Sequence, residues 1–240
     1  MSHNFRGYDK SILLAMKYFP EILCVPIMEN TEKPKCVKMK WLGFDGKTQV
    51  KCQFMDSFMH MSQKLETLIQ NQCNLKVTGN DNKTYMFESC STHIEEENIQ
   101  KLKDSFPALS SGFTNDTEFK MLLKKGVYPY DWMDDLNKLN TTKVLSKADF
   151  YNNFAKEHLP DEEYQHYLRV MDKLQMKKFQ DYHGVYLKTD VLQLADVCNE
   201  YRSLCMDNYG LDPFHFISAP SMTWRAALKI TKVTLELLTS

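Results

Sequence analysis

A long segment of helical periodicity near the C-terminal end constrains the fold of this chain more than any other feature. Between residues 185 and 205, apolar side chains recur at intervals of three and four, which is the period of an α-helix. They are Leu187, Val191, Leu194, Val197, Cys198, Tyr201 and Leu204. Gly184 precedes the segment, and Gly210 and Pro213 follow it, so we predict one amphipathic helix between these residues.

Tyr186 and Asp190 lie four residues apart, so they share one face near the predicted start of this helix. A carboxylate in the first turn is favoured by the helix dipole and is well placed to hold a cation. A phenol one turn away can orient a water molecule on that cation. The pair also fits a plain amphipathic helix whose aspartate caps its own first turn, and taken alone it favours that interpretation.

The N-terminal end of the chain carries a second group of polar residues. Asn4, Tyr8 and Asp9 precede an apolar run from residue 12 to residue 18, for which we predict a helix. Asp9 lies at or beside the first turn, where a negative charge is favoured. By themselves these residues fit an N-cap with a polar lead-in.

Together, the two groups resemble the motifs of a known family. N-F-R-G-Y-D, from Asn4 to Asp9, resembles the second exonuclease motif of family B DNA polymerases, and Y-L-K-T-D, from Tyr186 to Asp190, resembles the third. The first is most similar to the protein-primed branch, which includes phage, linear-plasmid and Maverick-type transposon enzymes. K-G-V-Y, which begins at Lys125, resembles a K-x-x-h motif of the same enzymes. Two weak motifs in the right order carry more weight than either alone.

This resemblance implies an α/β fold of the RNase H-like (DnaQ-like) 3′-5′ exonuclease type, incomplete at its N-terminal end and helix-rich in its C-terminal half. Residues 1–208 would be a partial exonuclease domain, and residues 209–240 a linker towards a polymerase palm domain. The first exonuclease motif, D-x-E, would precede Asn4, whereas the D-x-E at Asp161 fits the charged start of a helix. We therefore expect a fragment of a DNA polymerase of DNA replication that is nearly inactive as a nuclease by itself.

The resemblance also assigns catalytic roles. Asp190 would bind the catalytic metal ion and Asp9 would help to hold a second one, Mg²⁺ or Mn²⁺, in a two-metal site that is weak or incomplete here. Tyr186 would orient the attacking water, and Lys125 would assist the reaction near the DNA end. Asp9 and Asp190 must then converge on one pocket, although 180 residues lie between them.

Four further residues are implied contacts of single-stranded DNA. Asn4 and Tyr8 would touch its 3′ end, Tyr8 by stacking. Lys64 and Leu65 open the segment K-L-E-T-L, which resembles an (S/T)-L-x-x-h motif that contacts single-stranded DNA and a terminal priming protein. Lys64 replaces the expected hydroxyl residue and meets a phosphate only as a point charge. Leu65 also fits a core position.

Composition excludes several classes of protein. Seven cysteines, an odd number without a C-x-x-C pair, fit thiols in a reducing intracellular compartment, nucleus or cytoplasm, rather than a disulfide framework. No apolar run approaches the ~20 residues of a membrane helix, so we expect no membrane association. The net charge of −1 is not that of a basic nucleic-acid-binding tail.

Other elements follow from ordinary local signals. We predict strands at residues 22–28, 37–42 and 49–55, a helix from about residue 62, a hairpin at residues 75–87 and a short helix at residues 221–229. Ser146, in a capping box with Asp149, and Pro160 begin two more helices. We assign Tyr128, Tyr130 and Trp132, around Pro129, to packing. The lysines between residues 33 and 51 alternate with apolar residues, which favours a solvated sheet face over a phosphate-tracking surface.

Two other functions stay open beside the polymerase fragment. One is a non-catalytic module derived from such a polymerase and retained for binding DNA or a protein partner. The other is an unrelated α/β interaction domain in which the two motifs are accidental.

Overall fold

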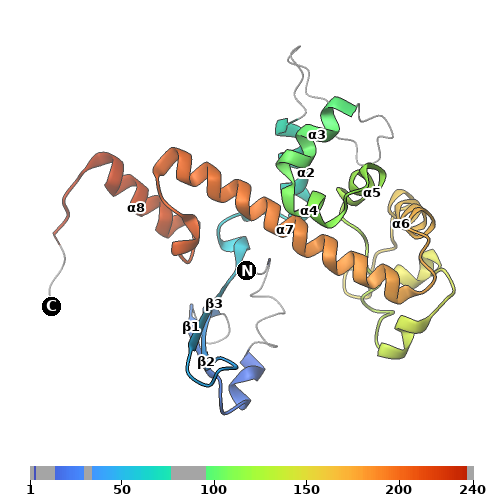
Figure 1. Cartoon of the computed structure of the whole chain (residues 1–240), viewed down its shortest axis with the longest axis horizontal. Helices are drawn as coiled ribbons and strands as arrows, with labels where there is room; N and C mark the ends of the chain where they lie inside the picture. Colours follow the sequence, from blue (N-terminus) through green and yellow to red (C-terminus); the bar gives the residue numbers. More distant parts are fainter. Residues whose placement is uncertain (1–2, 4–13, 30–33, 77–95, 237–240) are drawn as a thin grey trace. The chain divides into compact units, whose positions relative to one another are not determined.

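The computed structural model describes residue 3 and residues 14–29, 34–76 and 96–236 (Figure 1). It is a mixed α/β structure, in which helices are combined with one three-stranded antiparallel sheet. The chain forms two compact units: unit 1 joins Met1–Leu65 to Cys198–Ser240, and unit 2 is Glu66–Val197. The predicted division at residue 208 concerns the segments of a polymerase and stays a prediction.

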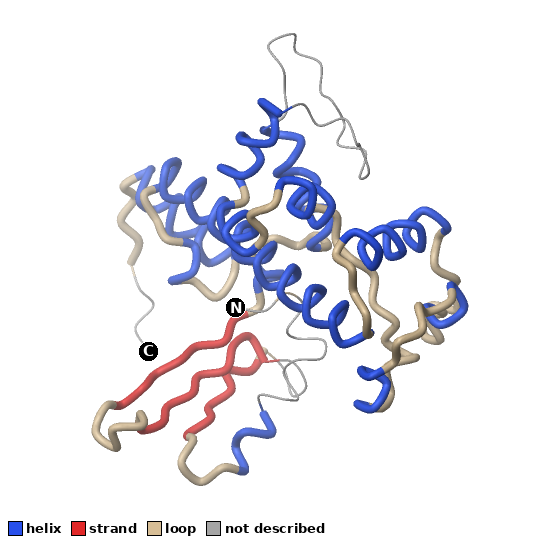
Figure 2. Tube along the Cα trace, turned by 45° about the vertical axis from the view of Figure 1, so that its right-hand side comes forward, coloured by secondary structure: helices blue, strands red, loops and turns tan. Residues whose placement is uncertain are grey.

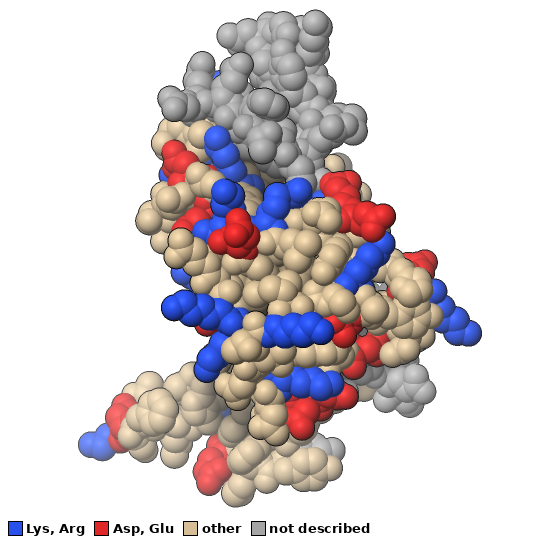
Figure 3. Space-filling model, turned by 90° about the vertical axis from the view of Figure 1, so that its right-hand side faces the viewer, with Lys and Arg blue, Asp and Glu red and all other residues tan. Residues whose placement is uncertain are grey.

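Charged side chains of both signs share the surface. On the face in Figure 3, lysines and arginines lie among aspartates and glutamates. This mixture agrees with the net charge of −1. The overall charge therefore does not indicate a site for a polyanion, and such a site depends on the charges of particular elements.

The sheet of unit 1 follows the predicted strands closely. Its strands are β1 (Leu23–Met28), β2 (Pro34–Leu42) and β3 (Gln49–Met55), paired in that order (Figure 2). Asp45 closes the turn between β2 and β3, because its carboxylate accepts the N–H groups of Lys47, at 3.0 Å, and Thr48, at 2.8 Å. Gly46 has a φ of +64°, which residues with a side chain rarely adopt.

Alternation along β2 gives the sheet one packed face. Val37 and Met39 are buried, and the partly buried residues packed against them are Leu14, Met16, Ile22, Cys24, Trp41 and Phe54. Leu14 and Met16 belong to a helical turn that precedes the sheet. This turn ends in the 3₁₀ helix η1 (Met16–Tyr18). The helix predicted over residues 12–18 is confirmed from residue 14 onwards, and its first two residues lie outside the described part.

The remaining elements of unit 1 are η2 (Ser57–Met59), the end of helix α7, η5 (Pro213–His215) and α8 (Ala219–Thr231). Lys229 on α8 holds the end of α7, because its Nζ donates to the carbonyl oxygens of Tyr209, at 2.7 Å, and Gly210, at 3.0 Å. The helix predicted over residues 221–229 is confirmed, since α8 contains it.

Unit 2 is built from helices. Its elements are α2 (Leu65–Lys76), α3 (Glu96–Ser105), α4 (Pro107–Gly112), α5 (Asp116–Leu122), η3 (Leu136–Asn140), η4 (Lys147–Phe150), α6 (Asp161–Lys173) and most of α7 (Phe179–Tyr209). With α8, these elements confirm the predicted helix-rich C-terminal half. The predicted hairpin at residues 75–87 is wrong at its start, because Leu75 and Lys76 end α2, and residues 77–87 lie outside the described part.

The helix predicted at Ser146 is only one turn, η4. The capping box does form, since the Ser146 N–H donates to the Asp149 carboxylate at 2.7 Å. The chain then becomes extended at Tyr151, and Asn152 pairs with Glu157 in an isolated β-bridge. The bridge uses the backbone hydrogen bonds that a longer helix would need.

Helix α7 begins earlier than its sequence predicts, at Phe179 instead of residue 185. Asp181 starts it, because its carboxylate accepts the N–H groups of Lys177, at 2.9 Å, and Lys178, at 3.0 Å. Gly184 therefore lies inside the helix, and Asp190 lies about three turns from its start rather than in the first turn. The helix dipole gives Asp190 no stabilisation there. The predicted C-terminal end, at Gly210, is confirmed.

The buried side of α7 also differs from the apolar pattern. Leu187, Val191 and Leu204 are 49%, 65% and 58% exposed, whereas Val197 and Cys198 are buried as expected. Three polar residues, Thr189, Gln193 and Asp196, are buried instead. For Gln193 and Asp196 the reason lies in their hydrogen bonds to the backbone of neighbouring helices, described below, which hydrophobic periodicity does not register.

Candidate functional site

The motif residues of unit 2 meet where the segment after α5 runs along α7. Asn115 starts α5, because its side-chain oxygen accepts the N–H groups of Thr117, at 2.9 Å, and Glu118, at 3.2 Å. Phe119 and Leu122 on this helix are buried. The short helix is therefore fixed at its start and along its packed side. This fixes the position of the segment that follows it, residues 123–127.

One stripe of α7 holds this segment by its backbone. The buried side chain of Gln193 donates from Nε2 to the carbonyl oxygens of Leu122, at 2.8 Å, and Leu123, at 3.1 Å. The hydroxyl of Tyr182 donates to the carbonyl oxygen of Val127. These anchors lie eleven residues apart on α7, on the face that also carries Tyr186 and Asp190.

Lys125 and Asp190 form an ion pair within this frame. The Lys125 Nζ lies 3.1 Å from the Asp190 Oδ1, and the two side chains are 32% and 38% exposed. That carboxylate oxygen is itself buried, but no described residue donates it a hydrogen bond of good geometry. The contact is therefore a half-buried ion pair without a well-oriented hydrogen bond. The Asp190 carboxylate can still accept a hydrogen bond from a better-placed donor.

Tyr186 stands beside this pair in an aromatic group. Its hydroxyl lies 2.8 Å from that of Tyr130, and its ring centroid lies 4.8 Å from that of Tyr128. Gly126 leaves room for the ring, since a Cβ there would lie 3.3 Å from it. Burial, followed by the hydrogen bond to Tyr130, raises the pKa of Tyr186. The phenol therefore stays protonated at neutral pH, where it can orient a water molecule but cannot act as a base.

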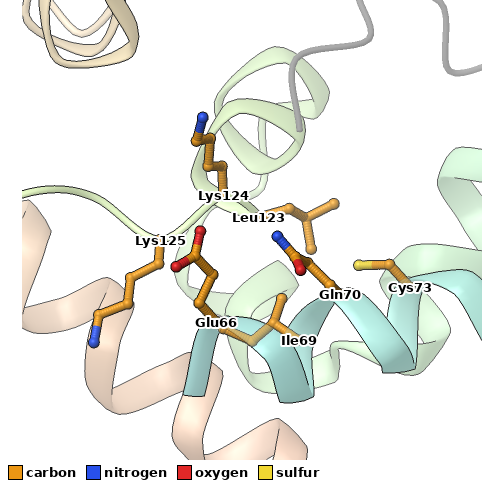
Figure 4. Close-up of a pocket in the computed structure, with 7 residues that line it drawn as sticks. All are labelled: Glu66, Ile69, Gln70, Cys73, Leu123, Lys124 and Lys125. Carbon is orange, nitrogen blue, oxygen red and sulfur yellow. The ribbon is translucent and has the colours of Figure 1, made fainter. Parts of the chain in front are cut away.

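Lys124 turns away from its neighbour Lys125 (Figure 4). Its Nζ lies 3.0 Å from Glu162 and 3.1 Å from Glu163, both in the first turn of α6. Burial alone would lower the pKa of Lys124, but the hydrogen bonds to the two glutamates outweigh it and raise the pKa. Lys124 thus fastens the segment to α6, while Lys125 faces the candidate site.

A small hollow lies behind the site. His166 and Thr189 line it together with Lys124, Gly126 and Tyr186. The His166 Nε2 and the Thr189 Oγ1 are buried and have no hydrogen-bond partner among the described residues. Burial, followed by the charge of Lys124, lowers the pKa of His166 to about 4. His166 is therefore neutral at pH 7.

Several of these residues escaped the sequence analysis. Asp196 is buried, and its carboxylate accepts the N–H groups of Ala108 and Leu109, both at 2.8 Å, at the start of α4. Burial raises the pKa of Asp196, against those two hydrogen bonds. With Gln193, it ties α4 and the end of α5 to α7. The sequence signal that could have identified Gln193 and Asp196 is the occurrence of a polar residue on the buried side of a helix. Tyr130, assigned to packing, is 71% exposed.

The other predicted site residues lie either outside the described residues or in unit 1. Asn4, Tyr8 and Asp9 lie outside the described residues, so the convergence of Asp9 and Asp190 stays a prediction. Lys64 is exposed and Leu65 is 4% exposed, and both belong to unit 1. Burial of Leu65 agrees with the core position that it also fits.

The predicted metal ions find few ligands in the described part of the chain. No three His, Cys, Asp or Glu side chains among the described residues are grouped to hold an ion. Asp190 is the sole predicted ligand within the described ranges, and Lys125 already offsets its charge. These residues alone do not fit a divalent ion, which needs several oxygen ligands.

No family model matches this chain, and no curated protein and no solved structure is significantly similar to it. The family resemblance therefore rests on the motif residues themselves. Among the described residues, no helix is both long and apolar enough to cross a membrane.

Proposed function

We propose that this chain carries the 3′-5′ proofreading exonuclease region of a protein-primed family B DNA polymerase, on an RNase H-like fold. The observation that carries the proposal is the 3.1 Å contact between Lys125 and Asp190. The resemblance takes these residues from two separate motifs and gives both a role at one DNA end. Tyr186, from the second of those motifs, adjoins the same segment.

The proposed partner is the 3′ end of single-stranded DNA, beside a terminal priming protein. Lys125 supplies a cation that can lie against the terminal phosphate and offset charge that develops there. The Tyr186 hydroxyl, held by Tyr130, supplies a fixed polar group that can orient a water molecule. Mg²⁺ or Mn²⁺ would need Asp9 and further oxygen ligands beside Asp190, so we derive no step through a metal ion.

A second candidate is a non-catalytic module derived from such a polymerase. Pairing of Asp190 with Lys125 favours it, because a carboxylate neutralised by a lysine holds a cation less well. The two candidates share the DNA site and differ in chemistry. Release of 3′ nucleotides in Mn²⁺ would exclude the second candidate, and it would also overturn the expectation that the chain is nearly inactive by itself.

Photo-crosslinking tests the shared site. A single-stranded oligonucleotide with 4-thiothymidine at its 3′ end should crosslink to peptides that contain Tyr128, Tyr130 or Tyr186. The same oligonucleotide with the photoreactive base at its 5′ end is the matched probe, and it should label these peptides far less. Equal labelling by both probes, or none by the 3′ probe, would contradict the proposal.

A further inference from the structure

Two neighbouring rows are open on the face of the unit 1 sheet opposite its packed one, and we call these two rows the open face. Strand pairing sets Leu23, Lys40 and Lys51 in one row across this face. The next row consists of Val25, Lys38 and Gln53. All six side chains are exposed, with Leu23 and Val25 at 57% and 45%.

Positive charge is in excess on this face. Lys40 and Lys51 are direct partners across β2 and β3, an arrangement in which like charges repel. The strand positions of this face contain no Asp or Glu, and the three lysines make no ion pair with another described residue. Glu21, in the turn before β1, lines a groove with Leu23 and Lys40 at this end of the sheet. An anion laid across the face would relieve the repulsion.

We infer that this open face binds the backbone of single-stranded nucleic acid. Lys38 and Lys40 are two residues apart on β2, so they repeat along the strand by about 7 Å. Lys51 widens this line by one strand spacing, about 5 Å. A single phosphate backbone can therefore meet all three cations, while Leu23 and Val25 offer apolar surface to bases on one side. Lysine contacts phosphate as a point charge, so binding is independent of sequence.

This binding is separate from the proposed exonuclease site, because it requires no 3′ end. The probe is a fluorescent oligothymidylate whose 3′ end is blocked by an inverted nucleotide, and the readout is anisotropy with the full chain over a range of salt concentrations. The test variant is Lys38→Gln, Lys40→Gln and Lys51→Gln together. A matched control removes three exposed lysines of unit 2, as Lys143→Gln, Lys173→Gln and Lys178→Gln.

Each phosphate contact on a single strand contributes about 0.7 to the slope of log affinity against log salt. The sheet variant should therefore lose about 2 from that slope, and the control variant should keep it. An unchanged slope in the sheet variant would overturn the inference, as would absence of binding by the wild type. Competition by polyglutamate as strong as by unlabelled oligothymidylate would also overturn it, in favour of an acidic polypeptide.

Discussion

Neighbouring residues in this chain have opposite roles, and their sequence does not distinguish them. Lys124 is buried between two glutamates of α6, whereas Lys125 faces Asp190. Resemblance to family motifs predicted that Lys125 and Asp190 are site residues, because a motif can be recognised in the sequence itself. The partners of Lys124 lie 38 and 39 residues further along, and only the fold brings them close.

The buried hydroxyl of Thr189 gives a prediction about stability. Its Oγ1 has no partner among the described residues, so Thr189→Val, which keeps the shape, should raise the free energy of unfolding by about 1 kcal/mol. Urea unfolding at pH 7 measures the change. Thr142→Val, at an exposed position, is the control and should change little. A destabilised Thr189→Val would mean that the hydroxyl is bonded in solution.

His166 gives a prediction about pH. Its pKa is about 4 in the folded chain against an ordinary 6.5, so the unfolded chain binds the proton first as the pH falls. Stability is therefore full above about pH 6.5 and is lost as the pH falls towards 4. Between pH 7 and pH 5, His166 should contribute a loss of about 2 kcal/mol. Urea unfolding of His166→Gln at both values should show a loss smaller by that amount; an equal loss would contradict the assignment.

At the scale of elements, local sequence signals predicted the helices and strands whose limits depend on neighbouring residues. The three strands, α8 and the end of α7 at Gly210 follow from alternation and turn residues. The start of α7 and its buried side were predicted wrongly, because they depend on a capping aspartate and on buried polar side chains. Gln193 and Asp196 are buried because they bond the backbone of α5 and α4, which lie far away in the sequence.

Replacement of Asp196 tests most sharply whether buried polar side chains of α7 hold α4. Asp196→Ala leaves two N–H groups at the start of α4 without their acceptor, so the free energy of unfolding should fall by about 3 kcal/mol. Asp207→Ala, on the exposed side of the same helix, is the control and should change stability by less than about 0.5 kcal/mol. Similar values for both variants would show that α4 is not held by Asp196.

At the scale of the whole molecule, the two nucleic-acid surfaces inferred for the chain belong to different compact units. The sheet face belongs to unit 1, and the Lys125–Asp190 pair belongs to unit 2. The alternation of lysines with apolar residues favoured a solvated sheet face over a phosphate-tracking surface, because the sequence does not give the strand register that sets Lys38, Lys40 and Lys51 on one face. Motif order did group Lys125, Tyr186 and Asp190, and the structure places these three side by side.

A double-mutant cycle on Lys125 and Asp190 tests the shared DNA site most directly. The measurement is the affinity of the chain for single-stranded DNA with a free 3′ end, relative to the same strand with a blocked one. Lys125→Gln should weaken the preference for the free end, and Asp190→Asn should strengthen it by releasing Lys125. In the double variant the two effects should fail to add by at least about 0.5 kcal/mol. Strict additivity, or no preference for the free end in the wild type, would contradict the account.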